Sequence, residues 1–313
     1  MAGPEHDPLA VTGISTDLAD LIALRAYLGR GEQERQRTIS PNPGTQYGKR
    51  KDSGLEFEDL RPYVVGDDVR HIDWNATART GETHVKLFRE SREHLTLIAV
   101  DLRASMFFGT RRALRSVAAC EFAALIAWHA AERGGRVGGL IITDKGDEAV
   151  RPHAGRKAPV PLLGQLHATH SHCLRNRHQF MPRRLQQIMA PLTHLARRGG
   201  AIVVVSSFDD PGSGFVEGLA AVERHADCLL VRVADPLERV PPPPGAYGIL
   251  SPEGRRRQVV IGEGDQLSAV RVLETEDLRV ETMLQDTGAR VMKVSTDEEP
   301  WKAMHRYLKI VER

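Results

Sequence analysis

Short apolar runs alternate with amphipathic segments from residue 95 to residue 311, and this alternation is the strongest constraint on the fold. The runs are LTLIAVD, RVGGLIIT, AIVVVS, CLLVRV and RVMKV, which begin at Leu95, Arg136, Ala201, Cys228 and Arg290. Apolar residues at helical spacing predict helices at residues 112–133, 183–197, 215–225, 278–288 and 301–311. Apolar strands between amphipathic helices are typical of an α/β fold whose mainly parallel sheet is covered by helices on both faces. Such folds place their sites at the carboxyl ends of the strands.

The composition along the chain predicts three parts. Residues 1–54 contain a disordered start (residues 1–14), a helix capped by Ser15 or Thr16, and a polar, flexible loop from residue 32. Residues 55–92 predict a β-rich extension of short strands, with a turn at Thr80-Gly81 before one of them. Residues 93–313 make up the α/β domain.

The charge balance limits the class of partner. The chain has 43 Lys and Arg residues against 41 Asp and Glu residues, a formal net charge of +2. A generic binder of nucleic acid or membrane surfaces would carry a large basic excess, so we expect no nucleic acid and no membrane insertion. The three cysteines, Cys120, Cys173 and Cys228, lie far apart, which favours reduced core residues of a cytoplasmic protein.

The stretch GDDVRHIDW, residues 66–74, concentrates carboxylates with an arginine and a histidine. One interpretation is a carboxylate cluster for two-metal hydrolysis. The other is a scaffold in which each aspartate pairs with an arginine and the tryptophan packs onto the sheet. Acid and base alternate through residues 56–90, which favours pairing. The scaffold residues would be Arg61, Asp67, Asp68, Arg70, Asp73, Trp74 and Arg79.

The first apolar strand runs into DLRASM, which places Asp101, Arg103 and Ser105 at its carboxyl end. Three oxygen side chains at this spacing would suit a hard cation such as Mg²⁺. Arg103 interrupts the set, because a guanidinium stays charged and cannot ligate a cation. We expect Arg103 to pair with Asp101 and to supply the positive charge itself. In the alternative, Arg103 points to solvent and Mg²⁺ binds through Asp101, Ser105 and water.

Three stretches carry a family resemblance. DLRASM resembles the D-x-S-x-S metal motif of von Willebrand factor A-type domains. The upstream segment GLEFEDLRPYVVGDDVRHIDWNATARTGETHVKLFRESRE and the later ADPLERVPPPPG resemble the signature of the family called domain of unknown function 58. The resemblance covers roughly residues 40–313 and implies a Rossmann-like A-type domain. Members are commonly encoded beside a MoxR-type AAA+ ATPase, and the resemblance implies an adaptor rather than an enzyme.

The resemblance also implies a metal-ion-dependent adhesion-type site, with departures at several positions. Arg103 stands at the first serine of the motif, and Ser207 stands where the third-loop aspartate is expected. Asp209 or Asp210 could substitute for that aspartate, and Thr169 or Ser171 for the second-loop threonine. The degenerate metal set is Asp101, Ser105 and Asp209, with weak Mg²⁺ binding at most. Arg103, Ser207, Asp210, Thr169 and Ser171 are then candidates for contact with a partner.

These observations lead to three hypotheses about function. The first is a non-enzymatic protein–protein interaction module, an adaptor of a MoxR-type AAA+ ATPase and of other von Willebrand factor A proteins. Its site would hold an acidic or basic side chain of the partner. The second is a metal-dependent hydrolase that uses Asp101 with Asp67, Asp68 and Asp73. The third is a structural subunit of a larger assembly. No G-x-x-x-x-G-K phosphate loop is present, so the chain is not itself the ATPase.

A histidine-rich stretch, HATHSHCLRNRH, leaves one further choice open. It contains His167, His170, His172 and His178 with Cys173 among them, and a zinc site is conceivable. Because the spacing fits no standard ligand pattern, a polar loop is the favoured interpretation.

Overall fold

The structure is a computed structural model that describes residues 13–28, 55–90, 94–176, 183–240, 243–250, 256–262 and 277–311. The chain forms two compact units, which are considered separately. The large unit comprises residues 1–39 and 94–313, and the hairpin unit comprises residues 40–93. Residues 1–12 of the stretch expected to be disordered (residues 1–14) and all of the expected flexible loop, residues 32–54, lie outside the described residues.

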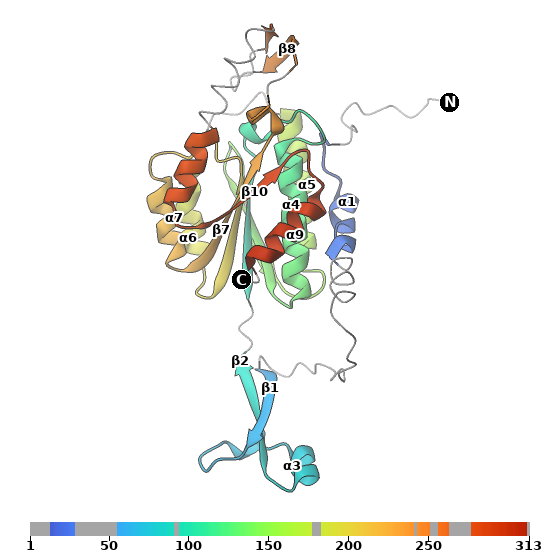
Figure 1. Cartoon of the computed structure of the whole chain (residues 1–313), viewed down its shortest axis with the longest axis vertical. Helices are drawn as coiled ribbons and strands as arrows, with labels where there is room; N and C mark the ends of the chain where they lie inside the picture. The colour runs from blue at the N-terminus through green and yellow to red at the C-terminus, as the bar shows by residue number, and fades with distance from the viewer. Residues whose placement is uncertain are drawn as a thin grey trace, which may run out of the picture. The chain divides into compact units, whose positions relative to one another are not determined.

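The large unit is built on a six-stranded sheet (Figure 1). Its strands lie in the order β10-β7-β6-β3-β4-β5, and neighbours are parallel except for β5, which runs antiparallel to β4. The strand order therefore reverses between β3 and β6: β4 and β5 lie beyond β3, and β7 and β10 lie beyond β6. The predicted α/β fold with a mainly parallel sheet is confirmed. The strands are β3 (Leu95–Asp101), β4 (Arg136–Ile142), β5 (Asp147–His153), β6 (Gly200–Ser206), β7 (Ala226–Ala234) and β10 (Arg290–Ser295).

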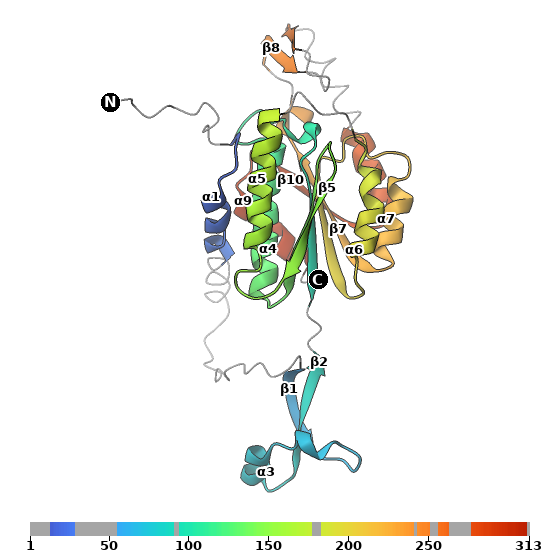
Figure 2. The ribbon, with the colours of Figure 1, turned by 180° about the vertical axis from the view of Figure 1, so that it is seen from behind.

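Helices cover both faces of this sheet (Figures 1 and 2). Successive residues of a strand point to opposite faces, so Ile98 and Val100 pack into one core while Leu97 and Ala99 pack into the other. The first core also takes in α1 (Leu18–Ala23), α4 (Arg115–Glu132), α5 (Val160–Asn176) and α9 (Pro300–Val311). The second takes in η3 (Leu185–Ile188), α6 (Met189–Leu195), α7 (Phe215–Glu223) and the helix at residues 277–286.

Helix α1 belongs to the large unit, which differs from the expected division at residue 54. The side chain of Asp17 caps α1 by accepting from Ala19 N, so the expected cap at Ser15 or Thr16 is wrong. Leu21 is buried in the first core, and its carbonyl oxygen accepts a hydrogen bond of 3.2 Å from Trp128 Nε1 of α4. Burial of one apolar face ties this short helix to the domain, because a helix of this length is unstable alone.

Helix α5 corrects the interpretation of residues 167–176 as a polar loop. Leu162, Leu163 and Leu166 are fully buried and form the apolar face of α5. The many histidines in this stretch made that face hard to identify from the sequence. A Cβ on Gly139 of β4 would lie 2.5 Å from Leu162 Cδ1 and 2.9 Å from Ile98 O. The missing side chain therefore lets α5 approach the sheet closely.

The sequence analysis did not predict one hairpin of the large unit. Strands β8 (Gly245–Leu250) and β9 (Arg256–Ile261) pair antiparallel with each other. Among the described residues, no helix has both the length and the apolar character needed to cross a membrane.

The hairpin unit consists of β1 (Leu55–Pro62) and β2 (His84–Glu90), paired antiparallel, with η1 (Val69–His71) and α3 (Trp74–Thr80) between them. Gly81 ends α3 in the left-handed conformation (φ 77°), which glycine adopts without strain. The predicted turn at Thr80-Gly81 before a strand is confirmed. Trp74 is 68% exposed, so it takes no part in a core of this unit.

Candidate functional site

The candidate site lies at the carboxyl edge of the sheet, where β3 and β6 end side by side. The strand order reverses between these two strands, and open α/β sheets form their crevices at such a point. The loop after β3 supplies Arg103 and Ser105, and the loop after β6 supplies Ser207, Asp209 and Asp210.

Asp101 and Arg103 form a buried ion pair at the end of β3. Arg103 Nε donates to Asp101 Oδ1 at 3.0 Å, and Arg103 NH2 donates to Asp101 Oδ2 at 2.8 Å. Asp101 also accepts from Ser206 Oγ of β6 at 2.6 Å. Asp101 is 0% exposed and Arg103 is 3% exposed, so the alternative in which Arg103 points to solvent is wrong.

The rest of the Arg103 guanidinium is held by backbone oxygens. Arg103 NH1 donates to Arg183 O at 2.5 Å, and NH2 donates to Asp209 O at 3.3 Å. Burial acts to lower the pKa of Arg103, but the charge of Asp101 and its hydrogen bond outweigh burial, so the pKa is raised. Arg103 is therefore a permanent cation, fixed by three segments of the chain.

Asp144 adds a carboxylate that the sequence analysis did not identify. It follows β4 directly, and its Oδ2 accepts from Ala104 N at 2.7 Å. Burial raises the pKa of Asp144, although the Ala104 bond and the charge of Arg103 act against that shift. Its position in the loop after β4, the strand next to β3, could have identified Asp144 as a site residue from the sequence.

The predicted metal ligands do not converge on one point. The carboxylate of Asp209 binds Arg115 NH1 at 2.7 Å, and the donors at Asp101 are Arg103 and Ser206. Ser105 contributes its backbone oxygen to Arg115 at 3.4 Å. Over the described ranges, no group of three or more His, Cys, Asp or Glu side chains is arranged to hold a metal ion. The donor set therefore does not fit a magnesium site built from Asp101, Ser105 and Asp209.

The other candidate partner-binding residues are scattered. Ser207 is buried, and Asp210 adopts the left-handed conformation with its carboxylate 3.6 Å from Arg184 Nε. Thr169 and Ser171 lie on α5, so their assignment to a loop at the sheet edge is wrong. Thr169 Oγ1 donates to Glu148 Oε2 at 2.9 Å.

A second buried network joins β7, α4 and the helix at residues 277–286. Arg232 NH2 contacts Glu238 Oε2 at 3.1 Å and Asp277 Oδ1 at 2.5 Å. Glu238 also binds Arg115. Burial acts to raise the pKa of Asp277, but the charges of Arg232 and Lys293 dominate and lower it. Sequence reasoning missed this network, because its members are far apart along the chain.

The segment ADPLERVPPPPG has a structural role in this network. Its Asp235 and Glu238 form a capping box around η4 (Pro236–Glu238): Asp235 Oδ1 accepts from Leu237 N at 3.0 Å, and Glu238 Oε1 accepts from Asp235 N at 2.7 Å. The cap fixes Glu238 between two arginines, Arg115 and Arg232.

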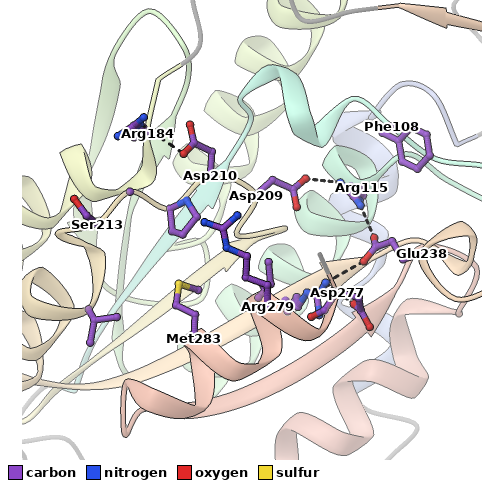
Figure 3. A pocket seen from close by; sticks show the side chains of 15 residues that line it. Phe108, Arg115, Arg184, Asp209, Asp210, Ser213, Glu238, Asp277, Arg279 and Met283 are labelled. Carbon is purple, nitrogen blue, oxygen red and sulfur yellow. Dashed lines mark hydrogen bonds and ion pairs between the residues drawn. The ribbon is translucent and has the colours of Figure 1, made fainter. Parts of the chain in front are cut away.

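These groups border a pocket of about 840 Å³ beside the Asp101–Arg103 pair (Figure 3). Four arginines and four carboxylates line it, and Val216, Val280 and Met283 supply an apolar wall. Figure 3 shows Arg279 reaching from the helix at residues 277–286 into the middle of this pocket. The charged lining residues are Arg115, Arg184, Arg232, Arg279, Asp209, Asp210, Glu238 and Asp277.

The carboxylates of the hairpin unit are divided among separate partners. Asp67 accepts from Arg61 at 2.8 Å and 2.6 Å. Asp68 binds Arg70, and the hydrogen bonds that Arg70 donates to it lower the pKa of Asp68 to about 2. The Asp73 side chain caps α3 at Asn75 N and Ala76 N, both at 3.0 Å. This arrangement agrees with the scaffold interpretation in that each aspartate has its own donors. Arg79 and Trp74 are exposed, so the expected packing of the tryptophan onto the sheet is wrong.

The histidines of α5 do not form a zinc site. His167 Nδ1 lies 2.9 Å from Thr16 O, and His170 Nε2 lies 3.0 Å from Ser116 Oγ. His172 is exposed and contacts Asn176, while His178 lies outside the described residues. The Ser116–His170 pair is fully buried, so no substrate reaches it.

Comparisons with known proteins agree with the resemblance seen in the sequence. A family model described as "Protein of unknown function DUF58" matches residues 59–272. The uncharacterised proteins Rv1480 of Mycobacterium tuberculosis (strain ATCC 25618 / H37Rv) and Mb1516 of Mycobacterium bovis (strain ATCC BAA-935 / AF2122/97) are each 27% identical over 273 residues. These alignments cover 85% of this chain and 78% of each relative.

Two solved structures show weak likenesses. A von Willebrand factor type A protein from Catenulispora acidiphila gives a TM-score of 0.32 at 12% identity, covering 49% of this chain and 35% of that chain. A mutant of the PilB minor pilin from Streptococcus sanguinis gives 0.31 at 10% identity, covering 74% of this chain and 65% of that chain. The sheet order and pairing, rather than these likenesses, define the fold. Because the family model matches more than half of the sequence, the chain belongs to the DUF58 family of proteins of unknown function.

Proposed function

We propose that this protein is a non-enzymatic protein–protein interaction module that serves as an adaptor for a MoxR-type AAA+ ATPase. The buried Asp101–Arg103 pair carries the proposal. It places a fixed guanidinium beside Asp101, the aspartate that would bind the metal ion in a metal-ion-dependent adhesion-type site. The site then keeps a positive charge at the carboxyl edge of the sheet without needing a metal ion.

The distribution of carboxylates favours this proposal over the metal-dependent hydrolase. Two-metal hydrolysis needs ligands that hold two ions about 4 Å apart. Asp67, Asp68 and Asp73 each have their own donors, and Asp101 is enclosed by Arg103 and Ser206. Arginine-paired carboxylates would have to lose their partners before they could bind metal.

Co-purification tests the adaptor function. The full chain would be co-expressed with a MoxR-type AAA+ ATPase of the same organism and analysed by size-exclusion chromatography. We expect the two proteins to elute together, and we expect the purified chain to hydrolyse no p-nitrophenyl phosphate with Mg²⁺ or Mn²⁺. Separate elution would reject the adaptor. Phosphatase activity that disappears in Asp101→Asn would support the hydrolase instead.

Magnesium binding tests the role of Arg103. We expect calorimetric titration of the wild-type chain to show no Mg²⁺ binding, because the bound guanidinium occupies Asp101. Arg103→Ser removes that charge and adds a hydroxyl beside Asp101. Mg²⁺ at ten times its dissociation constant should then stabilise this variant by about 1.4 kcal/mol in thermal unfolding.

Arg103→Met is the matched control, because it removes the charge without adding an oxygen ligand. It should gain less from Mg²⁺ than Arg103→Ser does. Micromolar Mg²⁺ binding by the wild-type chain, abolished in Asp101→Ala, would contradict the proposed role of Arg103.

A further inference from the structure

Two buried arginines on the pocket wall each have a donor without an acceptor. The Nε atoms of Arg115 and Arg232 are buried and have no hydrogen-bond partner. Both side chains are more than nine-tenths buried, and both line the pocket, where Figure 3 labels Arg115. A buried donor left unsatisfied is costly, and such a group calls for an acceptor supplied by water or by a ligand.

The opposite wall of the pocket also favours an acceptor. Helix α7 begins there, after Gly212 and Ser213, and its N-cap residue Gly214 provides no side-chain hydrogen bond. The first N–H groups of a helix point outward and carry a partial positive charge. Two exposed arginines, Arg184 and Arg279, complete this side of the pocket.

Of the two carboxylates that bind Arg115, Asp209 is the one that can be displaced. Glu238 and Asp277 are buried and shared among Arg115, Arg232 and neighbouring cations. The Asp209 side chain is 41% exposed and is bound through Arg115 NH1 at 2.7 Å. Arg115 keeps its bond to Glu238 if Asp209 turns into solvent, so the fold does not depend on the Asp209 contact.

We propose that the pocket binds a carboxylate side chain of a partner protein, and that Asp209 is an internal stand-in which this carboxylate displaces from Arg115. The inference rests on the proposed interaction function and assigns the contact surface and its chemistry. The incoming carboxylate accepts from Arg115 and Arg279, while an apolar residue next to it packs on Val216, Val280 and Met283. The recognised segment is therefore an acidic residue next to an aliphatic one.

The charges of the lining select this ligand. A cationic side chain would meet four guanidinium groups, two of which, those of Arg184 and Arg279, are exposed. A phosphate dianion would be repelled by the four lining carboxylates more strongly than a monoanion would. A single carboxylate exchanging for Asp209 leaves the charge at Arg115 unchanged and gains the apolar contact.

Nuclear magnetic resonance titration of the full chain with acetyl-Gly-Glu-Leu-Leu-Gly-amide tests the proposal. The peptide in which Gln replaces Glu should bind about tenfold more weakly, because it loses a charge-assisted hydrogen bond. Arg279→Gln should weaken binding of the Glu peptide by a similar factor. Asp209→Asn should tighten it several-fold, because the competing carboxylate is gone. Arg224→Gln is the matched control: this exposed arginine at the other end of α7 does not line the pocket, and the variant should bind like wild type.

Several results would overturn the proposal. They are no binding of the Glu peptide, equal binding of the Glu and Gln peptides, weaker binding in Asp209→Asn, or inorganic phosphate binding more tightly than the peptide. The test is separable from the adaptor function. If Arg279→Gln fails to bind the peptide but still elutes with the ATPase, the pocket is not the ATPase contact, and the adaptor function stands.

Discussion

Arg103→Ala is expected to lower the free energy of unfolding by about 3–5 kcal/mol, the cost of leaving one member of a buried ion pair without its partner. Asp101 would remain fully buried with only Ser206 Oγ and the backbone N–H of residue 103 as donors. The charge of the carboxylate would then be uncompensated in a region that water does not reach. Urea unfolding followed by circular dichroism measures the loss.

A double variant separates the charge from the packing. Asp101→Asn combined with Arg103→Met removes both charges, so it should recover part of the stability lost in Arg103→Ala. The exposed Arg175 on α5 provides the control, and Arg175→Ala should leave the unfolding midpoint unchanged. A loss below about 1 kcal/mol in Arg103→Ala, within the range of an exposed pair, would show that the guanidinium is not essential at this site.

Acidification is expected to destabilise the fold through His170. Burial, with a smaller contribution from the charge of His167, lowers the pKa of His170 to about 4 in the folded state. An unfolded histidine has a pKa of about 6.5. Between these values the unfolded state binds the extra proton, so stability falls as the pH decreases from 6.5 towards 4. From pH 7.5 to pH 5 the expected loss is about 2 kcal/mol.

The structural cause is the enclosure of the imidazole. His170 stacks on Phe107 with ring centroids 5.2 Å apart, lies 3.0 Å from Ser116 Oγ, and has its Nδ1 buried without a partner. His170→Gln should flatten the difference in stability between pH 7.5 and pH 5, whatever its stability at neutral pH. His172→Gln, on the exposed side of the same helix, should keep the wild-type difference. Equal pH dependence in all three proteins would rule out His170 as the cause.

The hairpin unit exposes several large apolar side chains. Its charged residues are largely satisfied within the unit, whereas Val65 and Trp74 are exposed there. A two-stranded hairpin is only marginally stable by itself, so contact with another protein would stabilise it.

Features that depend on neighbouring residues could be predicted from the amino-acid sequence. Apolar runs predicted β3, β4, β6, β7 and β10, and helical spacing predicted α4, α7 and α9, because periodicity reports which side of an element is buried. The Asp101–Arg103 pair was also predictable, since the two residues are two positions apart, although oxygens of distant segments also hold the guanidinium. The division of the hairpin carboxylates between nearby arginines has the same local origin.

The pairing of charges that lie far apart along the chain depends on the three-dimensional fold. Asp209 turns to Arg115 because the loop after β6 places Phe208 in the core and takes left-handed conformations at Phe208 and Asp210. Arg232 meets Asp277 because the fold brings β7 and the helix at residues 277–286 together. A buried charge is stable only when it is paired with another group. Strand order and loop conformation determine which groups meet, and the spacing of residues along the chain does not predict such contacts.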